Sequence, residues 1–106
     1  MANPWTGEVA LTVNGERHTA KLTLGALAEL EALLGAGSLT EMVGRFEGDG
    51  LKSADVLALV CAGLRGGGWR GQMEDLMEAE IDGGILEAAR VAARLLVLAF
   101  RPVPNG

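Results

Sequence analysis

The sequence predicts an α+β fold, in which an N-terminal β-hairpin is followed by about five short α-helices that pack as a small helical domain. Two observations predict it. Apolar and polar residues alternate on both sides of Asn14-Gly15, as they do in a hairpin. The rest of the chain repeats apolar residues at threes and fours between glycines. The 106 residues fit a single domain over 1–106, with the hairpin over about 7–24, the helices over about 25–100 and a short C-terminal tail over 101–106.

Composition limits both the core and the class of protein. Hydrophobic residues make up 49% of the chain and aromatic residues only 4%, so the core must be aliphatic. A formal charge of −5 excludes the basic face that binding of nucleic acid needs. One cysteine and one histidine exclude a disulfide framework, a cysteine-rich metal site and paired-histidine ligation. There is no signal-peptide pattern and no apolar stretch near the ~20 residues of a membrane span, so we expect a cytoplasmic protein.

The hairpin has a register that the sequence itself tests. A two-residue Asn14-Gly15 loop favours a type I′ turn, because both residues need a positive φ. It pairs Val13 with Glu16 and, two residues further on, Leu11 with His18. In this register one face carries the apolar residues of both strands: Val9, Leu11, Val13, Ala20, Leu22 and Leu24, with Trp5 if the first strand extends that far. A slip of one residue would expose one of the two apolar sets, so the agreement fixes the pairing.

Two helices are predicted after the hairpin. In the first, apolar residues recur at helical spacing: Leu24, Leu27, Leu30, Leu33 and Leu34. Gly35 and Gly37 then end it in the manner of a C-cap. The second helix begins where Ser38-Leu39-Thr40-Glu41 fits a capping box.

Three further helices follow. Ser53 is the expected N-cap of the third, with Asp55 in its first turn, and this helix runs into the break at Gly66-Gly67-Gly68. Acidic residues surround the fourth, from Gln72 to about Ile81. The last and longest, Ile85 to about Phe100, has a single polar stripe of Glu87, Arg90 and Arg94. A helix this apolar is central in the fold or buried by a partner.

The glycine-rich run contains the pattern G-x-G-x-x-G from Gly66 to Gly71. In a dinucleotide site this pattern follows a strand and opens a helix that is aimed at a pyrophosphate. Here a helix comes before it, so a flexible loop between helices is the favoured interpretation. The segment from Gly44 to Ser53 resembles a P-loop only faintly, because Lys52 does not directly follow a glycine and no strand leads into it.

The candidates for catalysis and metal binding are few. His18 lies on the apolar face of the hairpin, which favours a partly buried structural residue. Cys61 lies in an apolar helix and is read as a small hydrophobe, with a Cys61–His18 pair as the alternative. The acidic residues from Glu74 to Asp82 lack the spacing of a calcium loop and favour a solvated helix face. We therefore expect no catalytic residues, no cofactor, no metal and no enzymatic activity.

Two surface features favour binding of a partner protein. Trp69 lies in a glycine-rich loop between two arginines, which matches the composition of interface hot spots; the alternative is a Trp that folds back onto the helices as a core plug. The last helix has more apolar surface than a small domain needs to bury. The residues predicted to contact a partner are Trp69, Arg65, Arg70, Leu95, Leu98 and Phe100.

An ordered series of short segments resembles a known family. It opens with Leu22-Thr23-Leu24-Gly25-Ala26-Leu27-Ala28-Glu29-Leu30-Glu31. There follow Leu34-Gly35, Ser38-Leu39, Arg45-Phe46, Ser53 to Asp55, and Ala62-Gly63-Leu64-Arg65-Gly66-Gly67-Gly68. Together with the hairpin, the series covers roughly Val9 to Phe100 and is similar to the gene transfer agent tail protein family, which is grouped with phage tail assembly chaperones.

The resemblance implies a non-enzymatic role. Tail assembly chaperones bind the tape measure protein, keep it soluble, help to recruit tail tube subunits and are generally absent from the finished particle. The expected partners are therefore a tape measure protein and a tail tube protein, in the cytoplasm of a bacterial host, with neither nucleic acid nor membrane involved. A homo-oligomer is a further option. The alternative function is a structural component or connector of the phage-like tail.

Overall fold

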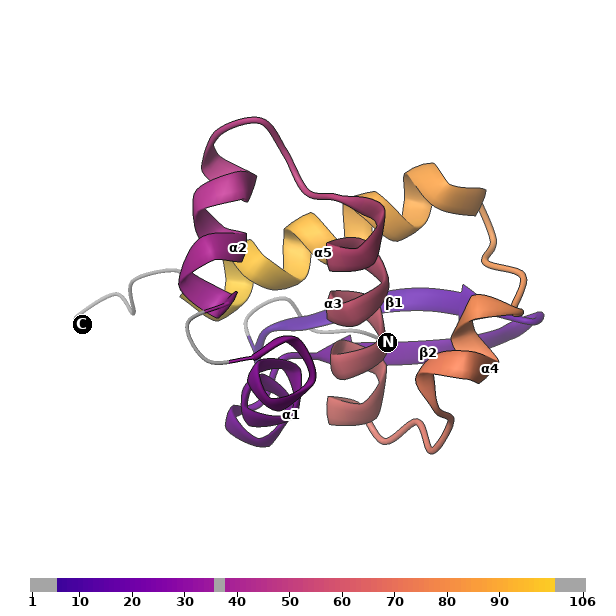
Figure 1. The fold of residues 1–106 in the computed structure, drawn as a ribbon. Coiled ribbons are helices and arrows are strands. Elements are labelled where there is room, and N and C mark those ends of the chain that lie inside the picture. The colour runs from indigo at the N-terminus through magenta and orange to yellow at the C-terminus, as the bar shows by residue number, and fades with distance from the viewer. Residues whose placement is uncertain (1–5, 36–37, 101–106) are drawn as a thin grey trace.

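The computed structural model of the protein describes residues 6–35 and 38–100, with all of their side chains except that of Ser38. The order of elements in this part of the chain is β1 (Glu8–Val13), β2 (Glu16–Lys21), α1 (Leu24–Leu34), α2 (Ser38–Glu47), α3 (Ser53–Gly66), α4 (Met73–Met77) and α5 (Gly84–Phe100). A two-stranded antiparallel sheet therefore precedes the helices, and the predicted α+β fold is confirmed (Figure 1).

The hairpin has the predicted turn and register. Asn14 and Gly15 have φ values of 51° and 80°, as a type I′ turn requires, and Val13 pairs with Glu16. The apolar face is buried along both strands: Val9, Leu11, Val13, Ala20 and Leu22. Leu24 is an exception, since β2 ends at Lys21 and Leu24 opens α1 with its side chain 86% exposed. The prediction for Trp5 lies outside the described residues.

Helix α3 is the centre of the molecule. It packs against β2, α1, α4 and α5, and α5 in turn lies on β1. Figure 1 shows α3 crossing the hairpin, with α1 on one side of it and α4 on the other. The largest fully buried side chains come from several of these elements, among them Leu30, Met42, Leu59, Leu64, Leu76 and Leu95. Among the described residues no aromatic side chain is fully buried in the core, so the core is aliphatic, as the composition predicts.

Three glycines let α3 lie this close to its neighbours. A Cβ on Gly67 would overlap the carbonyl oxygen of Thr19, and one on Gly66 would overlap that of Lys21, so both positions press on the backbone of β2. A Cβ on Gly63 would meet Leu95 Cδ1 at 2.6 Å. The interpretation of this run as a flexible loop is therefore wrong for Gly66 and Gly67, which form the packed end of α3.

The apolar stripe predicted for α1 is only partly correct. Its buried residues are Ala26 and Leu30, whereas Leu33 is 60% exposed. The N-cap is Thr23, whose Oγ1 accepts a hydrogen bond from Ala26 N at 3.0 Å. This cap places the start of α1 at Leu24. The capping box predicted at Ser38 involves a side chain outside the described part of the chain.

The start of α3 also differs from the prediction. Its N-cap is Lys52 rather than Ser53, and the Oδ2 of Asp55 accepts a hydrogen bond from the backbone N of Lys52 at 2.9 Å. The same carboxylate binds Arg45 of α2 through both oxygens, with Nη2–Oδ1 at 2.6 Å and Nε–Oδ2 at 2.8 Å. Asp55 is only 4% exposed. One side chain thus caps α3 and joins it to α2.

Helix α4 covers five residues, Met73–Met77, and not the whole stretch from Gln72 to Ile81. The chain after it joins the hairpin instead. Ile81 forms a β-bridge with Val13, and Asn14 exchanges backbone and side-chain hydrogen bonds with Glu80, with N–O distances of 2.7 and 2.8 Å. Contacts with a strand far away in sequence therefore decide the conformation of this segment, which local helical spacing could not show.

Candidate functional site

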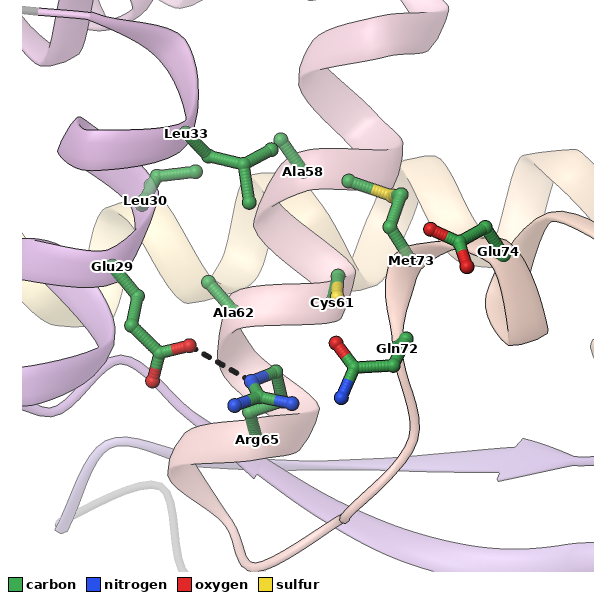
Figure 2. Close-up of a pocket in the computed structure, with 10 residues that line it drawn as sticks. All are labelled: Glu29, Leu30, Leu33, Ala58, Cys61, Ala62, Arg65, Gln72, Met73 and Glu74. Atoms are coloured by element: carbon green, nitrogen blue, oxygen red, sulfur yellow. Dashed lines mark hydrogen bonds and ion pairs between the residues drawn. The ribbon is translucent and has the colours of Figure 1, made fainter.

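A groove of about 210 Å³ opens between α1, α3 and the start of α4 (Figure 2). Leu30, Ala58, Cys61 and Ala62 are buried beneath it, and Leu33 lies exposed at its edge. Polar side chains complete the lining: Glu29, Arg65, Gln72 and Glu74. The groove is small and mixed in character, since pockets for drug-sized ligands usually measure roughly 300–1,000 Å³.

Arg65 ties the walls of this groove together. Its Nε donates to Glu29 Oε1 of α1 at 2.8 Å, and its Nη1 donates to the carbonyl oxygen of Gly71 at 2.9 Å. Figure 2 shows the first of these contacts spanning the groove. Of the predicted partner-binding residues, Arg65 is therefore engaged in holding α1 and the loop after α3 in place.

Cys61 lies at the groove but is buried. Burial raises the pKa of its thiol above the ordinary value, and the nearby Arg65 opposes this only in part. A raised pKa keeps the thiol protonated at neutral pH, whereas the thiolate is the nucleophile. His18 is not among the residues that line the groove, so the structure supports reading Cys61 as a small hydrophobe.

We expect the thiol of Cys61 to react with iodoacetamide at pH 8 at least about ten-fold more slowly in the native chain than in the chain unfolded in guanidinium, because both burial and a raised pKa suppress the thiolate. Mass spectrometry of timed samples measures both rates. Equal rates would show that Cys61 is accessible and would contradict its placement in the core.

The first three amides of the loop after α3 are not free to bind an anion. A phosphate cradle needs backbone N–H groups that are free to point at the ligand. Here the amides of Gly67, Gly68 and Trp69 donate to carbonyl oxygens of α3 at 2.9 to 3.1 Å. The G-x-G-x-x-G pattern therefore serves the end of a helix, and the dinucleotide interpretation fails on geometry as well as on order.

Trp69 folds back onto the protein. Its side chain is partly buried and packs against the core, and its indole ring lies over Gly71, where a Cβ would overlap the ring. Arg70 beside it is exposed. The packing agrees with the core-plug alternative, although the residue stays partly exposed.

The three predicted contact residues of α5 have different environments. Leu95 is 1% exposed and packs into the core with Ala88, Val91, Ala92 and Leu96, so its assignment to a partner-binding surface is corrected. It is buried because it continues the helical spacing that faces α3 and β1. Leu98 is partly buried against the core. Phe100 is 49% exposed and lines a shallow groove with Leu39 and Val43 of α2.

The sequence interpretation missed other exposed apolar residues. Met77 and Ile85 are each 64% exposed and Leu86 is 82% exposed, at the junction of α4 and α5. The excess apolar surface expected on the last helix does not single out Ile85 and Leu86, which directly follow Gly83-Gly84, and Met77 lies outside that helix. Over the described residues no group of three or more His, Cys, Asp or Glu side chains could hold a metal ion. Nor is any helix in 6–35 and 38–100 long and apolar enough to cross a membrane.

Comparisons with known proteins give one finding. Neither a search of curated proteins nor a search of solved structures returns a match. Residues 6–101 match a protein family described as "Phage tail tube protein, GTA-gp10", which supports the gene transfer agent tail family suggested by the segments from Leu22 to Gly68. The match makes no reference to a chaperone or a tape measure protein. Because it covers nearly the whole chain, this protein belongs to the phage tail tube, GTA-gp10 family.

Proposed function

We propose that this chain is a non-enzymatic structural component of the tail of a phage-like gene transfer agent particle. The observation that carries the proposal is the match of residues 6–101 to a family described as a tail tube protein. A structural subunit needs surfaces for neighbouring subunits rather than an active site. We infer that it contacts other tail proteins after synthesis in the cytoplasm of the host and remains in the finished particle.

The surface supports this proposal. Large apolar side chains are exposed near both ends of α5: Met77, Ile85 and Leu86 at its start, and Val97 and Phe100 at its end. Large contiguous apolar patches on the surface of a soluble protein usually mark interaction sites. Two such regions at opposite ends of one helix suit a subunit that meets a neighbour on each side.

The family segments, by contrast, mostly build the scaffold. Arg45 and Asp55 form the ion pair between α2 and α3, Thr23 caps α1, and Gly66 lets α3 approach β2. These segments therefore hold the domain together. The exposed apolar residues near both ends of α5 lie outside those segments.

We expect mass spectrometry of purified particles to find the chain in a fixed ratio to the other tail proteins. The structural role requires it to stay in the particle, so a variant lacking the exposed apolar groups, such as Leu86→Gln with Phe100→Gln, should be depleted from particles while remaining folded. The control is Arg94→Gln, which changes an exposed residue of the same helix. Ala89→Gln cannot serve as the control, because Ala89 is partly buried.

The finer alternative is an assembly chaperone for a tape measure protein, as the resemblance to tail assembly chaperones implies. It makes the opposite prediction, since a chaperone is present during assembly and absent from finished particles. Absence from purified particles, together with a tape measure protein that becomes soluble only when co-expressed with this chain, would replace the structural proposal. Thermal stabilisation by a nucleotide or metal would instead favour a ligand-binding function.

A further inference from the structure

A third groove, lined by other residues, opens between α3, α4 and the first turns of α5. It has a volume of about 210 Å³, and every residue that lines it is apolar or glycine. Val56, Val60, Leu76 and Ala88 lie buried at its floor, while Met77 and Ile85 stand at its rim with 64% of each residue exposed. We call this the α3–α4–α5 groove.

The size of this groove argues against a small-molecule ligand. Such ligands occupy pockets of roughly 300–1,000 Å³ with a few convergent polar groups, and the α3–α4–α5 groove is smaller and is lined by no polar side chain. A shallow apolar groove between helices instead suits the apolar side chains of another helix, laid in at spacings of three and four residues. Met77 adds an unbranched side chain that adapts to different apolar surfaces.

The charged residues next to the groove on its α4 side are all acidic. Glu78, Glu80 and Asp82 are chain neighbours of the lining residues Met77, Ala79 and Ile81, and all three are exposed. None of the ion pairs among the described residues involves these three carboxylates. On α5 the first two charged residues, Glu87 and Arg90, pair with each other at 2.7 Å and add no net charge. The α4 side of the rim is therefore acidic.

We propose that the α3–α4–α5 groove binds an amphipathic helix of another protein, with an apolar face for the groove and lysine or arginine on its flanks. Apolar contact supplies the affinity, and the acidic rim selects basic flanks and speeds association. A second copy of this chain fits less well, because each copy has a net charge of −5. The proposal rests on the groove and its charges and does not depend on the role in a tail.

The test uses the full chain and a pair of synthetic peptides. Both peptides have leucines at helical spacing over about 18 residues, enough for a helix of some length; one carries lysine on its flanks and the other glutamate at the same positions. The chain is ¹⁵N-labelled and titrated with each peptide. We expect the lysine peptide to bind at least ten-fold more tightly and to shift the amide signals of Met77, Ile85 and Leu86.

Two groove variants separate this site from general attraction of a basic peptide to an acidic protein. Ile85→Gln should weaken binding of the lysine peptide at least ten-fold, whereas Leu33→Gln, 60% exposed in the groove of Figure 2, should leave it unchanged. Glu78→Gln with Glu80→Gln should weaken binding several-fold and reduce its salt dependence. The matched control is Glu31→Gln with Glu47→Gln, which removes the same charge elsewhere. If Ile85→Gln does not fold, Met77→Gln replaces it.

Each other outcome overturns the proposal. Failure of the lysine peptide to bind shows that the groove is not a helix site, and equal binding of both peptides shows that the rim does not select basic flanks. Equal loss in the paired control variants shows attraction by overall charge alone. One combination of results identifies a second copy of the chain as the occupant. In it the chain self-associates, the Ile85→Gln variant is monomeric, and the lysine peptide shifts no amide signals.

Discussion

Gly67→Ala should reduce the free energy of unfolding by about 3 kcal/mol or more, the upper part of the range for overpacked positions. The new methyl group would overlap the carbonyl oxygen of Thr19 and lie 2.7 Å from the Thr19 carbonyl carbon. Both atoms belong to the backbone of β2, so no side-chain rotation can make room and α3 must move away from the sheet. Thermal unfolding followed by circular dichroism should show a Tm lowered by more than about 10 °C.

Two other glycine substitutions complete this experiment. At Gly63 the added methyl would meet the side chain of Leu95, which can adjust more readily than a backbone. We therefore expect Gly63→Ala to lower the free energy of unfolding by less than Gly67→Ala does. At Gly44, within α2, nothing lies within 4 Å of the added Cβ, and Gly44→Ala should be neutral or stabilise by up to about 1 kcal/mol. A Gly67→Ala variant as stable as Gly44→Ala would show that α3 does not press on β2.

Asp55→Asn should lower the free energy of unfolding by about 2–3 kcal/mol, which is typical of hydrogen bonds that involve charged groups at buried positions. Asp55 is 4% exposed, and its two oxygens accept from Arg45 and from the Lys52 amide. An amide at this position keeps the shape but loses the charge and one acceptor atom. Chemical denaturation with urea at pH 7 measures the difference.

The exposed pair of α5 provides the control. Glu87 and Arg90 also form a bidentate contact, with Nε–Oε1 at 2.8 Å and Nη2–Oε2 at 2.7 Å, but the Arg90 side chain is 56% exposed. Solvated pairs of this kind contribute about 0.2–1 kcal/mol, so Glu87→Gln should have little effect. Similar losses in the two variants would show that burial does not distinguish the pairs.

The contribution of Asp55 should also depend on pH. Hydrogen bonds from Arg45 hold the pKa of the Asp55 carboxyl below its ordinary value of 3.8, against the opposing effect of burial. A lowered pKa means that the stabilisation is fully present above this ordinary value and is lost as the pH falls through the folded-state pKa. The difference between the wild-type chain and Asp55→Asn should therefore be constant from pH 8 to pH 5 and shrink below about pH 4. A difference that is unchanged at pH 2.5 would rule out this ion pair as its source.

Local patterns in the sequence determine much of this protein. The Asn14-Gly15 turn, alternation in both strands and the steric demand for positive φ fix the hairpin and its register. The helical spacing of apolar residues and the glycines between segments fix the number of helices and the α+β class. The aliphatic core follows from composition, and the family follows from an ordered series of segments that a match over 6–101 supports.

Where local signals compete, only the tertiary structure decided which conformation forms. The segment after α4 is acidic and helical in pattern, yet Ile81 forms a β-bridge with Val13. The edge of β1 supplies this segment with the backbone hydrogen bonds that a further helical turn would otherwise provide. Leu24 and Leu33 share the spacing of buried leucines but stay exposed, because Thr23 sets where α1 begins and α3 covers only one of its faces. The spacing of apolar residues gives the period of a helix and not the direction in which its neighbours lie. The sequence therefore predicted a partner-binding role for Leu95, which is buried, and missed the exposed Met77, Ile85 and Leu86.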